Sequence, residues 1–416
     1  MTSDRYFYYK DNELYCEEAE VSKIAESVGT PFYLYSKKSI VYNYRNIDRA
    51  FAQIPHLICY ALKANSNLNI CKILAEEGCG ADVVSGGELY KAVYLGINPQ
   101  KIVFDGVGKT EDEIIYAVKE GLLLFNVESY QEIEIINKIA KRFKKIVAVG
   151  LRINPDVDLD VHPYDATGIG ISKFGISFED AIDVYKKTKK LGNIKIVGLH
   201  AHIGSQITKL EPFIETTSKL ISLAEVIKEI KYIDIGGGLG IPYGDEKVPT
   251  YSDLARLIIP PLKKLNVTVI IEPGRTIVGS SGILVSKVLY FKKMKEKNFV
   301  VVDAGMNDFV RPGLYGAFHQ IIPLTERQGE EITADIVGPI CELSDFLGKN
   351  IKMAKPEVGS FIAVKDTGAY GFSMSSNYNA RPRAPEIIVD KKDFFVARER
   401  ETYKDLIKTE RIIKEI

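Results

Sequence analysis

Short apolar runs alternate with longer amphipathic stretches from about residue 58 to 280. The runs are LICYALK (57–63), ADVV (81–84), KIVFD (101–105), LLLFNV (122–127), KIVAVGLRI (145–153), IKIVGLHAHI (194–203), YIDIG (232–236) and VTVIIE (267–272). Near-continuous apolar strands that alternate with helices are typical of a parallel sheet covered on both faces. Eight such units predict an α/β fold with a (β/α)8 barrel of the TIM type, and an open doubly wound sheet is the alternative.

The segments between the runs have the periodicity of amphipathic helices. In SYQEIEIINKIAKRF (129–143), isoleucines recur at the spacing that places them on one helical face. Ser129 and Ser177 precede two of these segments, and we expect both to be N-caps.

The pattern changes after residue 283, where strands separated by turns are expected with little helix between them. They are ILVSKVLYFKK, FVVVDA, ITADIVGPIC and SFIAVKD, and the N-terminal YFYYKDNELYCEE predicts a hairpin of the same kind. We therefore expect a barrel over residues 32–280. Residues 1–31 and 281–416 would together form a β-rich, sandwich-like or barrel-like domain that contributes to the active site.

Charge and composition narrow the function. Lys+Arg and Asp+Glu both number 55, so no basic excess indicates a nucleic-acid partner. No stretch reaches the roughly 18 apolar residues of a membrane span, and the N-terminus lacks the pattern of a signal peptide, which favours a cytoplasmic protein. Five dispersed cysteines without a C-x-x-C pair argue against a disulfide framework or a zinc site. The expected ligand is a small molecule, without a metal.

Polar residues stand at the ends of the apolar runs, where a barrel of this type builds its active site. These residues are Lys63, Ser85, Glu88, Asp105, Glu128, Arg152, His200, His202, the glycines of GGGLG (236–240), Glu272 and Arg275. Each is a weak signal alone, but eight runs whose polar ends converge predict a functional site.

The GGGLG segment follows the seventh run, next to the usual phosphate site of this fold. Backbone N–H groups without side chains can approach a phosphate closely, although a tight glycine turn explains the segment equally well. Ser205 and Gly274 on neighbouring loops favour the phosphate. No G-K-[ST] follows, so the segment is not a P-loop.

Lys63 opposite a phosphate site indicates pyridoxal phosphate bound as a Schiff base. Desolvation at the end of a buried strand favours the neutral, nucleophilic amine, whereas a lone lysine more often extends its amine to the surface. Glu272 suits the pyridine nitrogen, with a salt bridge to Arg275 as the alternative. We expect His202 against the ring face, and a structural core histidine is its alternative.

Seven motifs in order carry a resemblance to a known family. They are YALKAN, HAHIGSQ, GGGLG, EPGR, RPGLYGAFH, GPICELSDFLGK and GAYGFSMSSNYN, within a match from TPFYLY (30–35) through NARPRAPE (379–386). Together they resemble the fold-type III PLP-dependent decarboxylases.

The resemblance implies roles for individual residues. Lys63, His202 and Cys341 would be catalytic, and Cys341 and Glu342 would enter the other active site of a head-to-tail homodimer. The implied cofactor-binding residues are Lys63, Asp82, His202, Ser205, Gly237, Gly238, Glu272, Pro273, Gly274, Arg275 and Tyr370, and the implied substrate-binding residues are Arg275, Arg311, Tyr315, Glu342 and Tyr370. Leu343 departs from the usual C-E-S-x-D pattern, which puts the local hydrogen bonding in question.

Two arginines limit the choice of substrate. Arg275 and Arg311 offer bidentate forks for a carboxylate, but clamping the departing carboxylate would stabilise the ground state. They therefore predict a second, retained carboxylate, and Glu342 suits a distal ammonium. Meso-2,6-diaminopimelate meets both needs and would yield L-lysine and CO₂ in lysine biosynthesis. Cys341 is the expected proton donor to the carbanion, with a buried structural thiol as its alternative.

Three other functions stay open. A decarboxylase of ornithine, arginine or carboxynorspermidine would share the motifs but would not need the arginine pair. Alanine racemase shares the barrel and the lysine but has an arginine at the pyridine nitrogen, where this chain has Glu272. A non-catalytic PLP-carrying protein would lack the second domain that supplies Cys341.

Overall fold

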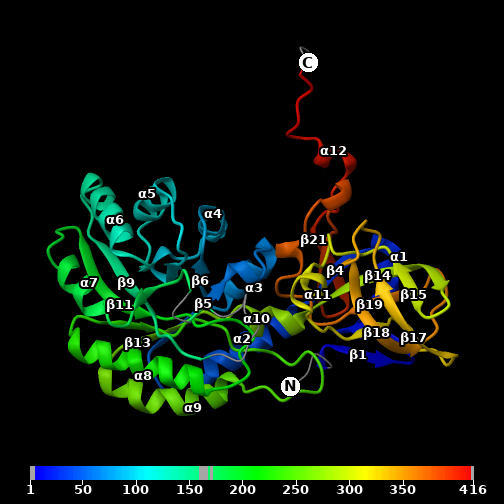
Figure 1. Cartoon of the computed structure of the whole chain (residues 1–416), viewed down its shortest axis with the longest axis horizontal. Helices are drawn as coiled ribbons and strands as arrows, with labels where there is room; N and C mark the ends of the chain where they lie inside the picture. The colour runs from blue at the N-terminus through cyan, green and yellow to red at the C-terminus, as the bar shows by residue number, and fades with distance from the viewer. Residues whose placement is uncertain (1–4, 159–166, 169–171, 414–416) are drawn as a thin grey trace. The chain divides into compact units, whose positions relative to one another are not determined.

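The computed structural model describes residues 5–158, 167–168 and 172–413, and it divides into two compact units. The barrel unit comprises Val41–Ile241 and Lys247–Ile277. The β unit comprises the chain up to Ile40, Pro242–Glu246 and the chain from Val278 onward. Figure 1 labels the elements of both.

Eight parallel strands form the closed barrel that the sequence predicts. They are β5 (His56–Ala61), β6 (Gly80–Val83), β7 (Ile102–Phe104), β8 (Leu124–Val127), β9 (Val147–Asn154), β11 (Ile194–His200), β12 (Tyr232–Asp234) and β13 (Thr268–Ile271). Neighbours in the sheet follow chain order, and β13 pairs with β5 in parallel, which closes the ring. The open doubly wound sheet is thereby excluded. A short strand, β10 (Ile176–Ser177), extends the sheet beside β9.

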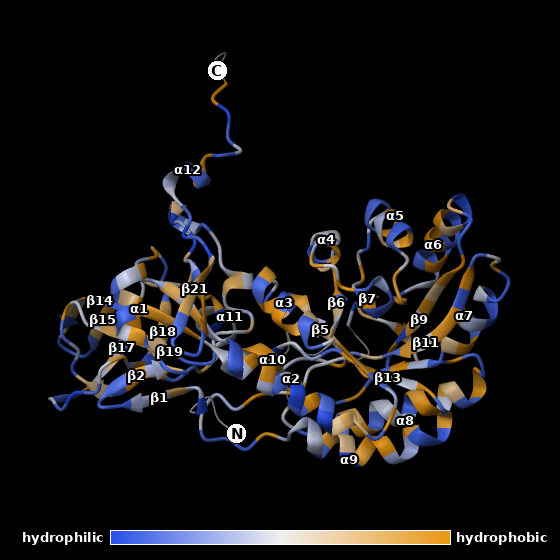
Figure 2. Cartoon of the chain, turned by 180° about the vertical axis from the view of Figure 1, so that it is seen from behind, coloured by the Kyte–Doolittle hydropathy of each residue, from blue (hydrophilic) through white to orange (hydrophobic). Residues whose placement is uncertain are grey.

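Helices connect the barrel strands, as the amphipathic segments predict. They are α3 (Leu68–Glu76), α4 (Gly86–Tyr94), α5 (Glu111–Glu120), α6 (Tyr130–Arg142), α7 (Ala181–Thr188), α8 (Glu211–Val226) and α9 (Tyr251–Leu262). Two further helices flank the barrel in the chain: α2 (Lys37–Phe51) precedes its first strand, and α10 (Arg275–Val278) follows its last. Figure 2 shows apolar residues along β11 and β13 and a mixture of apolar and polar residues on α6 and α8. This is the distribution expected of helices with one buried face.

One of the two expected N-caps is confirmed and the other is wrong. Ser129 accepts a hydrogen bond from the Glu132 N–H at the start of α6. Ser177 instead ends β10, and α7 begins four residues later, with Asp180 as its N-cap. The Ser177 hydroxyl does accept from the Asp180 N–H, so it stabilises the turn that leads to the helix. Because β10 pairs with β9, the backbone of Ser177 is extended and α7 begins only at Ala181.

The β unit is a nine-stranded sheet with a separate three-stranded meander. The order of neighbouring strands in the sheet is β18 (Phe346–Ala354), β17 (Glu331–Val337), β15 (Asn298–Val302), β14 (Gly282–Lys293), β4 (Phe32–Ser36), β20 (Glu386–Asp390) and β21 (Asp393–Arg398). In addition, β19 (Phe361–Val364) pairs with β14, and β16 (Ile321–Pro323) pairs with β19. The meander consists of β1 (Phe7–Lys10), β2 (Glu13–Cys16) and β3 (Ala19–Glu20), and the short helices are α1 (Val21–Val28), α11 (Arg311–Tyr315) and α12 (Tyr403–Leu406). Both ends of the chain thus supply strands, as expected.

Strand β4 lies in the sheet of the β unit, although the sequence boundary at residue 32 groups it with the barrel. It pairs antiparallel with β14 and parallel with β20, and all five of its residues are buried. A short, uniformly apolar strand carries no periodic signal that tells which sheet receives it.

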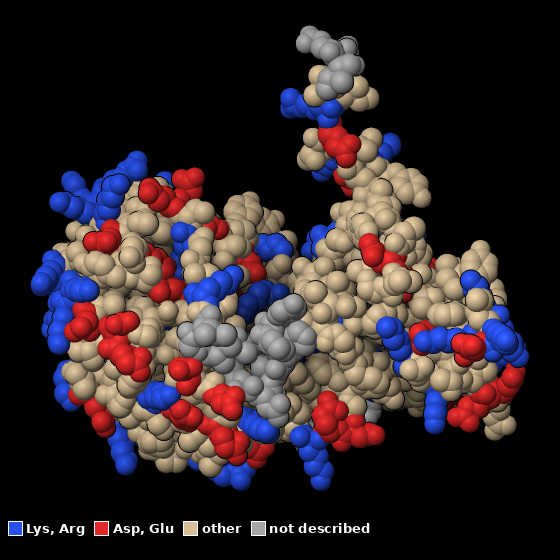
Figure 3. All heavy atoms as spheres, viewed as in Figure 1, with Lys and Arg blue, Asp and Glu red and all other residues tan. Residues whose placement is uncertain are grey.

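The surface bears out the balanced charge. On the face drawn in Figure 3, basic and acidic side chains are interspersed over both units. Within the described ranges, the helices are too short or too polar to cross a bilayer.

Candidate active site

Buried polar side chains collect at the carboxyl ends of the barrel strands. They are Asp82 in β6, Asp105 after β7, Asn126 in β8, Arg152 in β9, His200 at the end of β11, Asp234 at the end of β12 and Glu272 after β13, each at most 5% exposed. Burial of polar and charged groups is costly unless they are paired. Such a concentration at one end of a barrel therefore indicates a functional site.

Lys63 lies at this end of the barrel, in a 3₁₀ turn (Leu62–Ala64) that directly follows β5. Its Nζ is 2.8 Å from Oδ2 of Asp82, whose side chain is completely buried. Register explains the contact, because Ala61 at the end of β5 is paired with Asp82 in β6. Burial raises the pKa of Asp82 to about 7, and Lys63 acts in the opposite direction. The sequence predicts a neutral, desolvated amine at Lys63, but burial of the strand end alone does not indicate that a carboxylate lies next to this amine.

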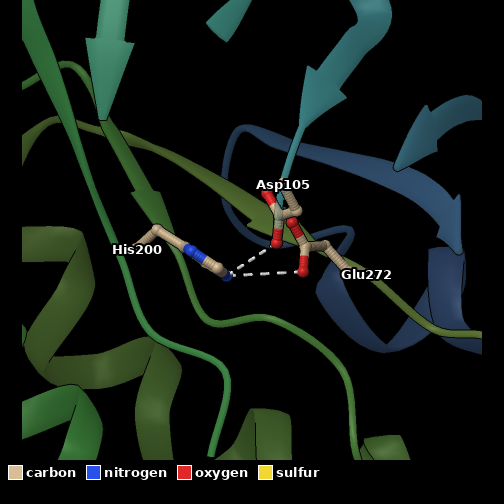
Figure 4. Close-up of side chains that lie close together, drawn as sticks. All are labelled: Asp105, His200 and Glu272. Carbon is tan, nitrogen blue, oxygen red and sulfur yellow. Dashed lines mark ion pairs between the residues drawn. The ribbon is translucent and has the colours of Figure 1, made fainter. Parts of the chain in front are cut away.

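Glu272, His200 and Asp105 form a second buried group (Figure 4). Nε2 of His200 lies 3.4 Å from Oε2 of Glu272 and 3.5 Å from Oδ2 of Asp105. Burial, and next the charge of Asp105, raises the pKa of Glu272 well above its ordinary value. Against its own burial, His200 and then Arg152 lower the pKa of Asp105 to about 2. The donor atoms of the trio lie within 4.8 Å of one another, a spacing that a shared proton or a cation could bridge.

His202 is fixed by the glycine turn. The Gly237 N–H donates to Nδ1 of His202 at 3.2 Å, so the proton of the neutral ring is on Nε2. Burial, and next the charge of Lys63, lowers the pKa of His202 well below its ordinary value. The ring is therefore neutral near pH 7, which suits packing against another ring.

The glycines of the turn are required by close packing. A Cβ on Gly237 would lie 2.2 Å from the carbonyl oxygen of Glu272, and one on Gly238 would lie 2.2 Å from that of Gly204. Gly238 also has a φ of 101°, which residues with a side chain rarely adopt. The turn thus brings bare backbone against the Glu272 and Ser205 loops.

The EPGR segment is tied to the strand that precedes Lys63. The Ala61 N–H donates to the carbonyl of Pro273, and a Cβ on Gly274 would lie 2.9 Å from that of Ala64. Arg275 donates from Nη2 to Oγ of Ser205 at 2.8 Å. Among the residues that the structure describes, the ion-pair partner of Glu272 is His200, so the alternative of a salt bridge to Arg275 is not observed.

In the β unit, α11 carries Arg311 and Tyr315. The Arg311 guanidinium lies 5.5 Å from the centre of the Tyr315 ring and 5.8 Å from that of Tyr243. His319, buried, packs edge-on against Tyr243 at 4.6 Å and contacts the Lys365 carbonyl through Nδ1. Sequence reasoning missed Tyr243 and His319, although His319 closes the RPGLYGAFH motif.

Cys341 and Glu342 lie on an exposed loop of the same unit. Buried Asp345 holds the loop by accepting from the N–H groups of Ile340 and Met306. Leu343 is fully exposed, so the hydrogen bonds of the loop do not depend on its side chain.

The last three residues of the GAYGFSMSSNYN motif, NYN (377–379), contact the loop that carries Cys341. The Cys341 N–H donates to Oδ1 of Asn379 at 3.0 Å, and the Tyr378 hydroxyl donates to Glu342 at 2.5 Å. Neither Tyr378 nor Asn379 was singled out from the sequence, and only the motif that contains them pointed here. Tyr370, earlier in the motif, has a left-handed backbone with a φ of 55°.

The structure thus gathers one set of expected residues in the barrel unit. These are Lys63, Asp82, His202, Ser205, Gly237, Gly238, Glu272, Pro273, Gly274 and Arg275. Within the β unit it joins Arg311 to Tyr315 and places Cys341 next to Glu342 on the loop bound by the NYN segment.

Comparison with known proteins identifies the family of the chain. Residues 37–279 match the family model described as pyridoxal-dependent decarboxylase, pyridoxal binding domain. A diaminopimelate decarboxylase of Aquifex aeolicus is 46% identical over 403 residues, 96% of each chain. Crystal structures with L-lysine of the diaminopimelate decarboxylases from M. jannaschii and Helicobacter pylori superpose with TM-scores of 0.95 and 0.91. They are 40% and 42% identical and cover 99% and 94% of this chain, and 99% of each of theirs. The chain therefore belongs to the pyridoxal-dependent decarboxylase family.

Proposed function

We propose that this chain removes CO₂ from meso-2,6-diaminopimelate and forms L-lysine, with pyridoxal phosphate as its cofactor. The observation that carries the proposal is the gathering of Lys63, a buried Glu272 and a glycine turn at one end of the barrel. The similarity to diaminopimelate decarboxylases over almost the whole chain supports the choice of substrate.

The residues present fit the cofactor. The Glu272 side chain is buried, and neither of its carboxylate oxygens receives an N–H or O–H at ordinary hydrogen-bond geometry from the described residues. A protonated ring nitrogen would satisfy such a carboxylate. Bare backbone at Gly237 and Gly238 suits a phosphate, and the Lys63 amine suits an aldehyde.

Each residue then has a defined task. Pyridoxal phosphate, when bound, supplies an aldehyde that condenses with amines and a ring that takes up the electron pair left by departing CO₂. Lys63 would hold the cofactor, and Glu272 would keep a proton on its ring nitrogen. His202 would pack against the ring, and Asp82 orients the lysine amine through its ion pair. Ser205, Gly237, Gly238 and the backbone of residues 272–275 would hold the phosphate.

We assign substrate recognition mainly to the β unit. Arg311 and Tyr315, with Arg275, bind the carboxylate that stays on the product, and Tyr370 contacts substrate and cofactor. Glu342 binds the distal ammonium, and Cys341 returns a proton to the carbon that loses CO₂.

The proposal includes a cytoplasmic homodimer with shared active sites. Cys341 and Glu342 lie exposed on their own chain, which leaves them accessible to the active site of a partner subunit. All five cysteines are free, as is usual for proteins of a reducing compartment.

A substrate panel tests the function. The purified chain, supplied with pyridoxal phosphate, is given meso-diaminopimelate, ornithine, arginine or carboxynorspermidine, and CO₂ and amine products are measured. We expect L-lysine and CO₂ in equal amounts from meso-diaminopimelate and at least a hundredfold lower rates from the others. Faster CO₂ release from any other substrate would contradict the proposal and identify that amino acid as the substrate.

A further inference from the structure

The end of the barrel that carries Lys63 holds more buried carboxyl groups than the proposed chemistry explains. Asp82, Asp105, Asp234 and Glu272 are each at most 2% exposed. Lys63 pairs with Asp82. His200, whose side chain is fully buried, lies between Asp105 and Glu272, and none of the roles proposed above includes it.

Three of the four carboxylates already have firm partners. Asn126 donates from Nδ2 to Asp105 at 2.7 Å and to Asp234 at 3.1 Å, and Asp234 also accepts from the Gly236 N–H. Asp82 accepts from Lys63. Glu272 shares a carboxyl–carboxylate contact with Asp234, and its ion-pair partner among the described residues is Nε2 of His200 at 3.4 Å.

The charge state of Asp105 indicates the direction of that contact. An ionised carboxylate only accepts, and the lowered pKa of Asp105 keeps it ionised, so Nε2 of His200 donates toward Asp105 and can donate to Glu272 in its ionised form. Figure 4 shows this nitrogen directed at both carboxylates. At 3.4 and 3.5 Å the contacts are longer than ordinary hydrogen bonds, as catalytic hydrogen bonds often are before ligands bind.

We propose that His200 is a positioning residue, which holds the Glu272 carboxylate ionised and correctly oriented through a proton that it shares with Asp105. The inference rests on the proposed function, because it assigns Glu272 to the ring nitrogen of pyridoxal phosphate. Glu272 needs such help, since burial and two neighbouring carboxylates favour its neutral form. A neutral carboxyl would not keep the ring nitrogen protonated.

Other charged and titratable groups face this pair from every side of the barrel. Around Glu272 they are Lys63, Asp82, Asp105, Asp234, Cys59 and Tyr251, and around His200 they are Asp105, His202 and Asp234. All of these stay unchanged in the His200 variants described next, so the variants isolate the imidazole.

The first test uses cofactor binding and needs no substrate. Apoenzyme is titrated with pyridoxal phosphate from pH 6 to 9, and binding is followed by the visible absorbance of the lysine-bound cofactor. We expect His200→Phe to weaken binding about tenfold at pH 7. Affinity should recover as the pH rises, because Glu272 ionises without help at higher pH. His200→Gln retains an N–H near Nε2 and should restore most of the affinity.

The second test asks whether His200 acts through Glu272. In a double-mutant cycle, His200→Phe should cost little further affinity once Glu272→Gln is present, because the positioned group is gone. Equal losses in both backgrounds would overturn the proposal. Asp105→Asn removes the competing carboxylate and should move the acidic limit of binding to lower pH. It supplies an independent test if His200→Phe does not fold.

His56→Asn is the matched control. It removes an imidazole–carboxylate contact, with Asp48 at 3.2 Å, from the opposite end of β5. Cofactor affinity and its pH dependence should stay those of the wild type. Unchanged binding in His200→Phe would refute the role of His200 whether or not the chain acts on diaminopimelate, because no substrate enters this assay. Absence of lysine formation would refute only the proposed function.

Discussion

In the barrel unit the candidate residues stand at the ends of successive parallel strands, whereas in the β unit they stand on a five-residue helix and on loops. Register alone brings Lys63 to Asp82 and His200 to the Glu272 loop. In the β unit, the Cys341 loop depends on a buried carboxylate, Asp345, and on contacts with a distant segment.

This difference separates two kinds of task. A rigid scaffold suits cofactor chemistry, which needs a carboxylate, an amine and a phosphate site at fixed positions. Loops on a scaffold suit substrate choice, because they vary without disturbing the core. Variants in the barrel unit should therefore affect the cofactor first, and variants in the β unit should affect turnover or substrate affinity while the cofactor stays bound.

The largest effect is expected at Lys63. Lys63→Ala removes the amine that holds the cofactor, so the visible absorbance of the holoenzyme and all turnover should be lost. Absorbance spectra and lysine formation check both. Lys101→Ala, at a half-buried lysine whose amine donates to the Gly78 carbonyl, should retain the spectrum. A wild-type spectrum in Lys63→Ala would remove this lysine from the cofactor site.

Cys341 should show the opposite behaviour, with turnover affected and cofactor retained. A positioned general acid typically contributes about 10²–10⁴-fold, so we expect Cys341→Ala to lower kcat by about 10²-fold or more. The visible spectrum should not change. Leu343→Ala, on the same exposed loop, is the control and should leave kcat unaltered. If Cys341→Ala turned over like the wild type, another group would have to donate the proton.

Arg311 tests substrate recognition. Arg311→Lys keeps the charge but loses the planar fork, and a charge-assisted hydrogen bond is worth about 2 kcal/mol, roughly thirtyfold in kcat/KM. We expect most of the loss in KM for meso-diaminopimelate, measured by initial rates. Arg327→Lys, at an exposed pair with Glu357, provides the comparison. An unchanged KM would place the retained carboxylate elsewhere.

The last effect bears on stability and not on activity, and it concerns a buried acid that stands apart from the candidate residues. Burial raises the pKa of Asp308 in the β unit to about 7, above an ordinary value of about 4. A carboxyl with a raised pKa stabilises the fold most below pH 4, and this contribution falls as the pH rises to 7.

Asp308→Asn should therefore flatten the pH dependence of unfolding. Relative to the wild type, the variant should gain about 2 to 4 kcal/mol between pH 4 and 8. Denaturant unfolding of the apoprotein can be followed by tyrosine fluorescence, since the chain has no Trp. Asp393→Asn, an exposed position on β21, should leave the slope unchanged. A parallel pH profile for Asp308→Asn would show that this carboxyl titrates normally.

The same contrast explains what the sequence could predict. The barrel strands could be predicted because eight apolar runs recur with amphipathic helices between them. Most of the candidate residues could then be identified from their positions at the ends of these runs. The ion pair of Lys63 with Asp82 required the register of β5 and β6, which no local pattern encodes. Tyr243 and Tyr378 required the course of loops, and Ser177 was misassigned because a strand pairing overrode a favourable cap.

The placement of β4 has a consequence for synthesis on the ribosome. Its partners in the sheet are β14, which begins at Gly282, and β20, which begins at Glu386. At ordinary translation rates the strand FYLYS therefore emerges on the order of tens of seconds before either partner exists. The barrel segment can fold during that interval, while an apolar strand waits unpaired. Nascent chains stalled before residue 282 should accordingly be the form of this protein that most needs a chaperone.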